Sequence, residues 1–249
     1  MVENLVVGAP FFCKQMIQRL VTSNPSPAYV QRVASVFAGN GKGIRGDLAA
    51  VWLAILVDDE ARSPAGLTDP SFGKLREPML RFVQWARSFG VTSSDDKWII
   101  DDLSDPGSKL SQSPLRSPSV FNFFRPGYVP PTSSLSTGSV APEFQLVNEG
   151  SVGGYLNFMA VVLQKGLNLQ RIKASYTDEL ALVTDATALV QRLNTVLCAG
   201  QLSAATQSLF VTALNATPVT ATSTDTVKKN RVYAAVLMVL ASANYLIQK

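Results

Sequence analysis

NPSPAYVQRVASVFAGNG, residues 24–41, carries the pattern that decides the fold class. Ser26 is a good helix N-cap, Pro27 suits the first helical position, and Gly39 is a natural stop. Between them, apolar residues recur at helical spacing and form one face: Tyr29, Val30, Val33, Val36 and Phe37. The stretch therefore predicts an amphipathic α-helix.

The same periodicity continues on both sides of this stretch. Asp47 can cap a helix that carries Trp52 and Ile55, and Pro78 opens another helix that Gly90 ends. Further helices are predicted in four segments: about 152–165, about 177–199, the stretch from Ser203, and about 225–245. Neither a fixed repeat nor strong strand alternation is visible. The predicted fold class is mainly α, an irregular multi-helix bundle with a long Pro/Ser/aromatic-rich connection.

That connection also defines the expected domain organisation. It is rich in Ser, Pro, Asp and Gly and has few periodic stretches. We expect one helical domain over 1–249, with helical halves at about 10–90 and 152–249 joined by an irregular segment, 91–151. A loop of this length is unusual in a compact domain, and such loops tend to be functional or packed on their own side chains.

The amino-acid composition limits which classes of function are possible. Hydrophobic residues make up 47% of the 249 residues and charged residues only 16%, which indicates extensive burial or a surface meant to be covered. The net charge of +4 is too mild to suggest nucleic-acid binding. The apolar run 232–241 is short of the about 20 residues that a spanning helix needs. The N-terminal stretch also lacks the features of a signal peptide.

The chain contains no histidine. Nucleophile pairs that need histidine, and zinc, haem or iron sites that need it as a ligand, therefore cannot be completed within these residues. We find no complete catalytic motif and no signal for a cofactor or metal, so the sequence leans away from an enzyme. The two cysteines, Cys13 and Cys198, are expected to be buried thiols, although one long-range disulfide is an alternative.

Two polar stretches resemble ligand loops and have simpler interpretations. SSDDKWIIDDLSDPG, residues 93–107, has the oxygen-rich side chains that calcium prefers, but it lacks EF-hand spacing. We favour a solvated turn region. GNGKGIRG, residues 39–46, has the glycines of a phosphate loop but no Gly-Lys-Ser/Thr ending, and we interpret it as a helix–helix connection.

LRSPSVFNFFRPGYVPP, residues 115–131, is too apolar for a solvated loop and too rich in proline for a helix. It is either a pocket for a ligand or an irregular plug whose arginines and Asn122 satisfy freed carbonyls. We favour the plug, and both can hold for different residues. The residues proposed as ligand-binding or structural are Arg116, Ser117, Ser119, Asn122, Phe123, Arg125, Tyr128 and Glu143.

Several stretches carry a family resemblance. They are QRLVTSNPSPAYVQRVASVF (18–37), GDLAAVWLAILVDDEAR (46–62), GKLREPMLRF (73–82), the segment 115–131, APEFQL (141–146) and RVYAAVLMVLASANYLIQK (231–249). Together they resemble the C-terminal half of the bacterial domain-of-unknown-function 1800 family. The most specific part is the motif at 117–128, SPSVFNFFRPGY.

The resemblance implies an exported, extracytoplasmic protein. It also implies two candidate partners, an N-terminal half with His- and Trp-containing motifs and a protein of a second exported family, domain-of-unknown-function 1501. No catalytic residues can be carried over from the family onto these positions.

Three functional hypotheses follow. The preferred one is a non-catalytic helical structural or interaction module, which predicts exposed apolar surface and self-association. The first alternative is a carboxylate-based hydrolase acting on cell-surface polysaccharide, which needs two carboxylates in one cleft, for example from among Asp102, Glu143 and Glu149. The second is a binding module that uses Arg116, Arg125 and Tyr128.

Overall fold

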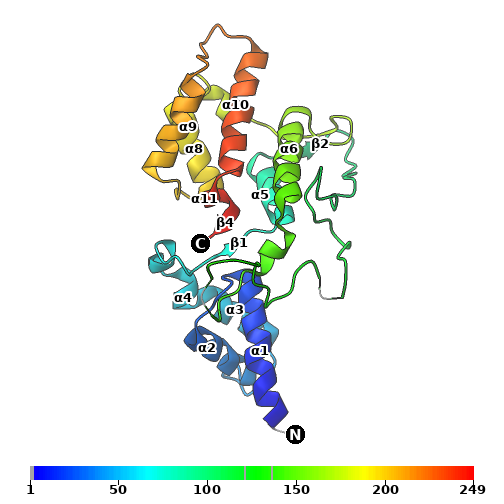
Figure 1. Ribbon diagram of the computed structural model, residues 1–249, viewed down its shortest axis with the longest axis vertical. Coiled ribbons are helices and arrows are strands. Elements are labelled where there is room, and N and C mark those ends of the chain that lie inside the picture. The colour runs from blue at the N-terminus through cyan, green and yellow to red at the C-terminus, as the bar shows by residue number, and fades with distance from the viewer. Residues whose placement is uncertain (1–2, 121, 136) are drawn as a thin grey trace. The chain divides into compact units, whose positions relative to one another are not determined.

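The computed structural model describes residues 3–120, 122–135 and 137–249 (Figure 1). Phe121, part of the aromatic segment, lies outside them. The fold is mainly α, as predicted. The α-helices are α1 (Glu3–Leu20), α2 (Pro27–Ala38), α3 (Leu48–Val57), α4 (Asp59–Arg62), α5 (Pro78–Ser88), α6 (Glu149–Lys165), α7 (Thr177–Ala181), α8 (Ala186–Cys198), α9 (Ala204–Asn215), α10 (Asp225–Leu240) and α11 (Ala243–Leu246).

The remaining regular elements are short. They are the 3-10 helices η1 (Pro64–Leu67) and η2 (Pro142–Leu146) and the strands β1 (Lys74–Leu75), β2 (Thr92–Ser93), β3 (Ile172–Lys173) and β4 (Ile247–Gln248). Between β2 and η2, the described residues contain no helix or strand, which agrees with the predicted irregular connection. Among the same described residues, no helix is both long and apolar enough to cross a membrane.

The chain divides into two compact units. The first comprises the residues up to Leu75 together with Phe124–Gln145 and Ile247–Lys249. The second comprises Arg76–Phe123 and Leu146–Leu246. The irregular connection is therefore divided between the two units. Whether 1–249 folds as one domain stays a prediction.

The first unit is built on the packing of α1, α2 and α3. Its core contains side chains from all three helices, including Cys13, Ile17, Tyr29, Val33 and Ile55, all of them fully buried. The predicted start of α2 is confirmed, because the Ser26 hydroxyl accepts a hydrogen bond from Tyr29 N at 3.1 Å.

The predicted cap of α3 is likewise confirmed. Asp47 Oδ1 accepts a hydrogen bond from Ala50 N at 3.2 Å. The glycine-rich stretch at 39–46 connects α2 to α3, as expected. Within it, Asn40 Oδ1 accepts hydrogen bonds from Lys42 N and Ile44 N at 2.9 and 3.1 Å, which stabilises the turn.

The first unit also contains the antiparallel pair β1–β4, in which Lys74 faces Gln248 and Leu75 faces Ile247. Gly73, directly before β1, has φ +114°, and a Cβ atom there would lie 2.5 Å from Gln248 O. Glycine at this position lets the two strands approach each other.

The second unit packs α6, α8 and α9 around α10 (Figure 1). Leu189 and Leu193 of α8 and Val232, Val236 and Leu240 of α10 are all at most 1% exposed. Cys198 is buried here, whereas Cys13 is buried in the first unit. Both are free thiols, as expected.

Two predicted helices are interrupted in the second unit. The helix expected at about 177–199 is divided into α7 and α8, because Asp185 caps a new helix by accepting a hydrogen bond from Ala188 N at 3.0 Å. The helix expected at about 225–245 ends at Leu240. The Ser242 hydroxyl then donates to Val239 O at 2.7 Å, and α11 begins at Ala243.

Candidate functional site

The aromatic segment is partly buried. The Phe124 side chain is only 2% exposed, and the guanidinium carbon of Arg19 lies 4.1 Å from the centre of its ring. This geometry is a cation–π contact, and it anchors the start of the first-unit part of the segment against the end of α1. Phe123, by contrast, is half-buried and belongs to the second unit.

The polar residues before Phe123 are exposed. Arg116 Nη1 lies 3.2 Å from Asp102 Oδ2, with both side chains largely open to solvent. Ser117 and Ser119 are exposed, and Ser119 O accepts a hydrogen bond from Asn122 N at 3.1 Å. The exposed Asn122 has φ +69°, a conformation that asparagine tolerates in turns. These four residues therefore form a surface turn region of the second unit.

Arg125 and Tyr128 lie in the first unit and are held through their backbones. Arg125 N donates to Gln145 Oε1 at 2.9 Å, and Tyr128 O accepts from Ala141 N at 2.9 Å. The Arg125 side chain is exposed and that of Tyr128 is half-buried. The structure thus places Arg125, Tyr128 and Glu143 in one unit and the other five candidate residues in the other.

Glu143 is buried in an ion pair. Its Oε1 lies 3.0 Å from Lys74 Nζ, and the two side chains are 2% and 1% exposed. Lys74 Nζ also donates to Arg19 O at 2.7 Å. Glu143 Oε2 has no hydrogen-bond partner among the described residues, so the desolvation of this carboxylate is only partly compensated.

Hydrogen bonds from the last turn of α1 and from the turn after it hold the segment that leads to Glu143. Asn24 exchanges two hydrogen bonds with Val140, donating to its O at 3.0 Å and accepting from its N at 2.8 Å. Gln18 Nε2 donates to Ser23 O at 3.0 Å and to Pro126 O at 3.4 Å. The amide side chains of Gln18 and Asn24 therefore help to hold this segment.

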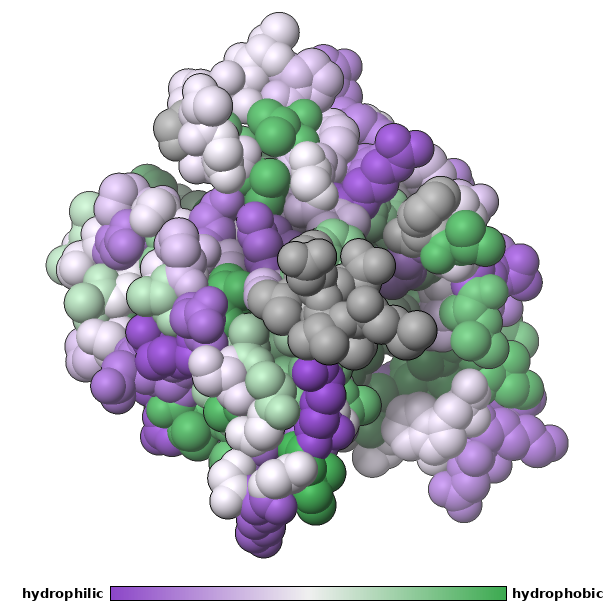
Figure 2. Space-filling view, turned by 90° about the horizontal axis from the view of Figure 1, so that it is seen from below, coloured by the Kyte–Doolittle hydropathy of each residue, from purple (hydrophilic) through white to green (hydrophobic). Residues whose placement is uncertain are grey.

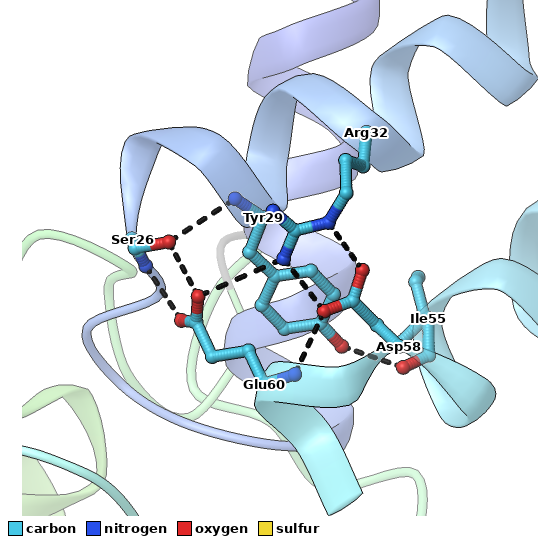
Figure 3. Close-up of polar contacts among 6 residues, drawn as sticks. All are labelled: Ser26, Tyr29, Arg32, Ile55, Asp58 and Glu60. Carbon is cyan, nitrogen blue, oxygen red and sulfur yellow. Dashed lines mark hydrogen bonds and ion pairs between the residues drawn. The ribbon is translucent and has the colours of Figure 1, made fainter. Parts of the chain in front are cut away.

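A second polar cluster joins α2 to the corner between α3 and α4 (Figure 3). Arg32 Nε and Nη2 donate to Asp58 Oδ2 and Oδ1 at 2.8 and 2.7 Å, a two-pronged ion pair. Asp58 Oδ1 also accepts from Glu60 N at 2.9 Å and so caps α4. One carboxylate thereby serves both a salt bridge and a helix start.

The same cluster extends to the start of α2 (Figure 3). Glu60 Oε1 accepts from Ser26 N at 2.8 Å, and the Ser26 hydroxyl donates to Glu60 Oε2. Tyr29, in the first turn of α2, donates its hydroxyl proton to Ile55 O at 2.5 Å in the core. These contacts fix the start of α2 against the end of α3.

The electrostatics of this cluster follow from its contacts. The hydrogen bonds from Arg32 hold the pKa of the Asp58 carboxyl below its ordinary range. Burial raises the pKa of the Tyr29 hydroxyl, and the nearby carboxylates of Asp58 and Glu60 raise it further. Tyr29 therefore keeps the hydroxyl proton that it donates to Ile55 O.

Most of the carboxylates described above are engaged in structural contacts and are not available as reactive groups. Asp58, Glu60 and Glu143 are all engaged in structural contacts. In the acidic stretch, Asp95 and Asp102 accept hydrogen bonds from nearby serine hydroxyls and backbone N–H groups. Within the part of the chain that the structure describes, no three His, Cys, Asp or Glu residues come together to hold a metal ion.

The family comparison gives the identity of the chain. The model of the family described as "Protein of unknown function (DUF1800)" matches residues 7–247, nearly the whole length. The chain belongs to the DUF1800 family. No curated protein and no solved structure matches it.

Two residues of this DUF1800 chain that form contacts in these polar clusters were not anticipated from the sequence. Lys74, which pairs with Glu143, gave no local signal, because the two residues lie far apart in the chain and no spacing rule connects them. Glu60, which binds the start of α2, lies in α4, a short helix that was not predicted from the sequence. The capping residue Asp58 was the one readable signal there.

Proposed function

We propose that this DUF1800 chain is a non-catalytic helical interaction module of an exported bacterial protein, and that it self-associates through α3. Export and bacterial origin rest on the family resemblance. The interaction role rests on one observation, the exposed apolar face of α3. A single stable copy gains nothing from leaving such a face in water.

The sequence of α3, LAAVWLAILV, contains no charged or polar side chain. Only Val51 and Ile55 are fully buried. On the opposite face Leu53, Leu56 and Val57 are 63%, 54% and 49% exposed. A helix that is apolar all round is ordinarily covered on all sides. On the surface in Figure 2, apolar residues (green) also appear among hydrophilic ones (purple).

We name Ala49, Leu53, Leu56 and Val57 the α3 stripe, because their spacing places them on one face of the helix. The charges at its two ends favour a second copy as the occupant. Basic residues Lys42 and Arg45 precede α3 and outnumber its acidic cap Asp47, whereas the acidic residue Asp59 follows it, next to Asp58, which Arg32 already pairs with.

Two stripes packed antiparallel about a two-fold axis bring the basic end of each copy to the acidic end of the other. The apolar stripe supplies the attraction, and the end charges select this orientation. A ten-residue helix is about 15 Å long and covers less than a standard interface, so we expect weak, concentration-dependent association.

The test is sedimentation velocity over a concentration series. We expect the native chain to shift toward a dimer as concentration rises and Leu53→Glu to stay monomeric. Leu209→Glu is the matched control, because Leu209 is a similarly exposed leucine in α9 of the other unit, at 65%. A monomeric native chain at every concentration, or equal loss in both variants, would contradict the proposal.

The charge argument has its own test. Lys42→Glu and Asp59→Lys should each weaken the dimer, and the two changes together should restore part of it. If the native dimer forms but the double variant loses as much dimer stability as the two single variants together, the antiparallel orientation is wrong. Capture of a domain-of-unknown-function 1501 protein by a monomeric native chain would replace self-association with that partner.

The hydrolase hypothesis gains no support from the geometry. Glu143, its best carboxylate, is paired with Lys74 away from solvent.

A further inference from the structure

The second unit contains a half-open cavity of about 540 Å³. It lies between the end of α6, β3, α7 and the first half of α10. Three lysines reach it from three different elements: Lys165 from α6, Lys173 from β3 and Lys229 from α10. We name it the lysine cavity. Its volume falls in the range of about 300–1,000 Å³ that is typical of small-molecule sites.

The charge of the lysine cavity has a single sign. Among the described residues that line it, there is no aspartate or glutamate. The two carboxylates of α7, Asp178 and Glu179, are held by Arg192 at 2.7 and 2.5 Å. Asp225 lies one turn before Lys229 on α10, and the structure contains no ion pair between the two. A concave site lined by one sign of charge concentrates the field and attracts counter-ions.

The three ammonium groups are not neutralised by neighbours. Lys173 Nζ donates to Gln170 Oε1 at 3.0 Å, which leaves its charge uncompensated. The side chains of Lys165 and Lys229 have no ion pair or hydrogen bond to any other described residue. Lys228, next in sequence to Lys229, instead donates to Ala221 O at 2.7 Å and does not line the cavity.

The wall of the lysine cavity is fixed by aromatic contacts. The rings of Tyr176 and Tyr233 meet edge to face, with centres 5.6 Å apart. Tyr176 is held in turn by a hydrogen bond from Trp85 Nε1 to its hydroxyl at 3.0 Å. Burial raises the pKa of the Tyr233 hydroxyl, so it stays a hydrogen-bond donor.

We propose that the lysine cavity binds a small soluble molecule that carries a phosphate group. Lysine is a common phosphate ligand, since its ammonium is a compact charge with three donors. The amides of Gln164 and Asn230 and the ring of Tyr233 line the same cavity and suit the hydroxyl groups of a polar body such as a sugar. The concave shape favours a small ligand over a flat membrane surface.

Calorimetric titration at low salt tests the proposal, with pyrophosphate and glucose 6-phosphate as probes and glucose as the uncharged control. We expect both phosphate probes to bind, glucose not to bind, and affinity to fall as salt is added. The variant Lys165→Gln/Lys173→Gln/Lys229→Gln should weaken binding by about tenfold or more, because each lysine contributes a charge-assisted contact.

The matched control is Lys14→Gln/Lys97→Gln/Lys228→Gln, which removes three positive charges outside the lysine cavity. It should change affinity by no more than about twofold, as expected for solvent-screened charges that do not line the cavity. Circular dichroism melts of both variants show whether each remains folded. A native-like melt of the cavity variant, with binding lost, would support the proposal directly.

Three results would overturn it. The first is that neither phosphate probe binds the native chain. The second is equal weakening by both triple variants, which would mean a general surface-charge effect. The third is binding to phosphatidylcholine vesicles that contain phosphatidic acid, with no binding of the soluble probes, which would mean a lipid surface.

Discussion

Lys74 and Glu143 form an ion pair at 3.0 Å in the interior of the first unit, and each side chain is at most 2% exposed. Lys74 belongs to β1 and Glu143 to η2, so the contact joins the irregular segment 124–145 to the strand pair. A buried pair is costly to form and more costly to break, because removing one partner leaves an unpaired charge.

This pair gives the first prediction. Glu143→Leu and Lys74→Met should each destabilise the chain by about 3–5 kcal/mol, and the double variant by clearly less than the sum. Urea unfolding of the four proteins measures the coupling. Lys74→Met also leaves Arg19 O without its donor, so we expect the double variant to remain somewhat below the native stability. Purely additive effects would mean that the pair does not interact.

The second prediction separates the plug from the pocket at 115–131. Phe124→Ala should cost about 3–5 kcal/mol, since it empties a buried site under Arg19. Arg116→Ala/Arg125→Ala should cost about 1 kcal/mol or less, because both side chains are exposed and the Arg116 ion pair lies on the surface.

Thermal and urea melts of these variants give both values. A large loss from the arginine variant would mean that the arginines support the segment, as the plug hypothesis first supposed. A small loss from Phe124→Ala would mean that the ring does not hold the segment in place.

Helix starts can be predicted from the sequence because their caps are local, whereas long-range contacts cannot. The starts of α2 and α3 were readable because Ser26 and Asp47 cap helices through residues three positions ahead. The same rule applied to Asp185 would have divided 177–199 correctly. There, the apolar pattern continues past the cap and therefore favours one long helix.

The candidate site is built from contacts between distant segments, which local sequence patterns do not predict. The pairing of β1 with β4 and of Lys74 with Glu143 is decided by tertiary packing between distant segments. The exposed face of α3 was also unreadable, because an all-apolar helix looks buried on every side. Only the structure shows which face lacks a partner within the described residues.

The third prediction concerns two adjacent glycines in α6. A Cβ atom on Gly154 would lie 2.2 Å from Pro106 O, whereas one on Gly153 meets nothing within 4 Å. Gly154→Ala should therefore destabilise by about 1–3 kcal/mol through overpacking. Gly153→Ala should stabilise by about 0.5–1 kcal/mol, because alanine favours a helix interior. Denaturant unfolding decides, and equal effects would mean that the loop at Pro106 does not pack on α6.

The fourth prediction concerns pH. Hydrogen bonds from Arg32 lower the pKa of Asp58 in the folded chain. Asp58 therefore binds a proton more weakly when folded than when unfolded, and it contributes to stability above its unfolded pKa. That contribution is lost as the pH falls through the folded pKa. Asp58→Asn should be less stable at neutral pH and should lose stability less steeply below about pH 4.

Asparagine can still cap α4, so this change isolates the ion pair from the cap. Arg32→Gln should likewise reduce the loss of stability below about pH 4. Adding it to Asp58→Asn should have little further effect on the stability. Asp59→Asn, at the exposed residue next to Asp58, is the control. Its stability should fall below about pH 4 as steeply as that of the native chain. If Asp59→Asn flattens the curve as much as Asp58→Asn does, the acid sensitivity comes from the charge at the start of α4, and the contact with Arg32 is not its cause.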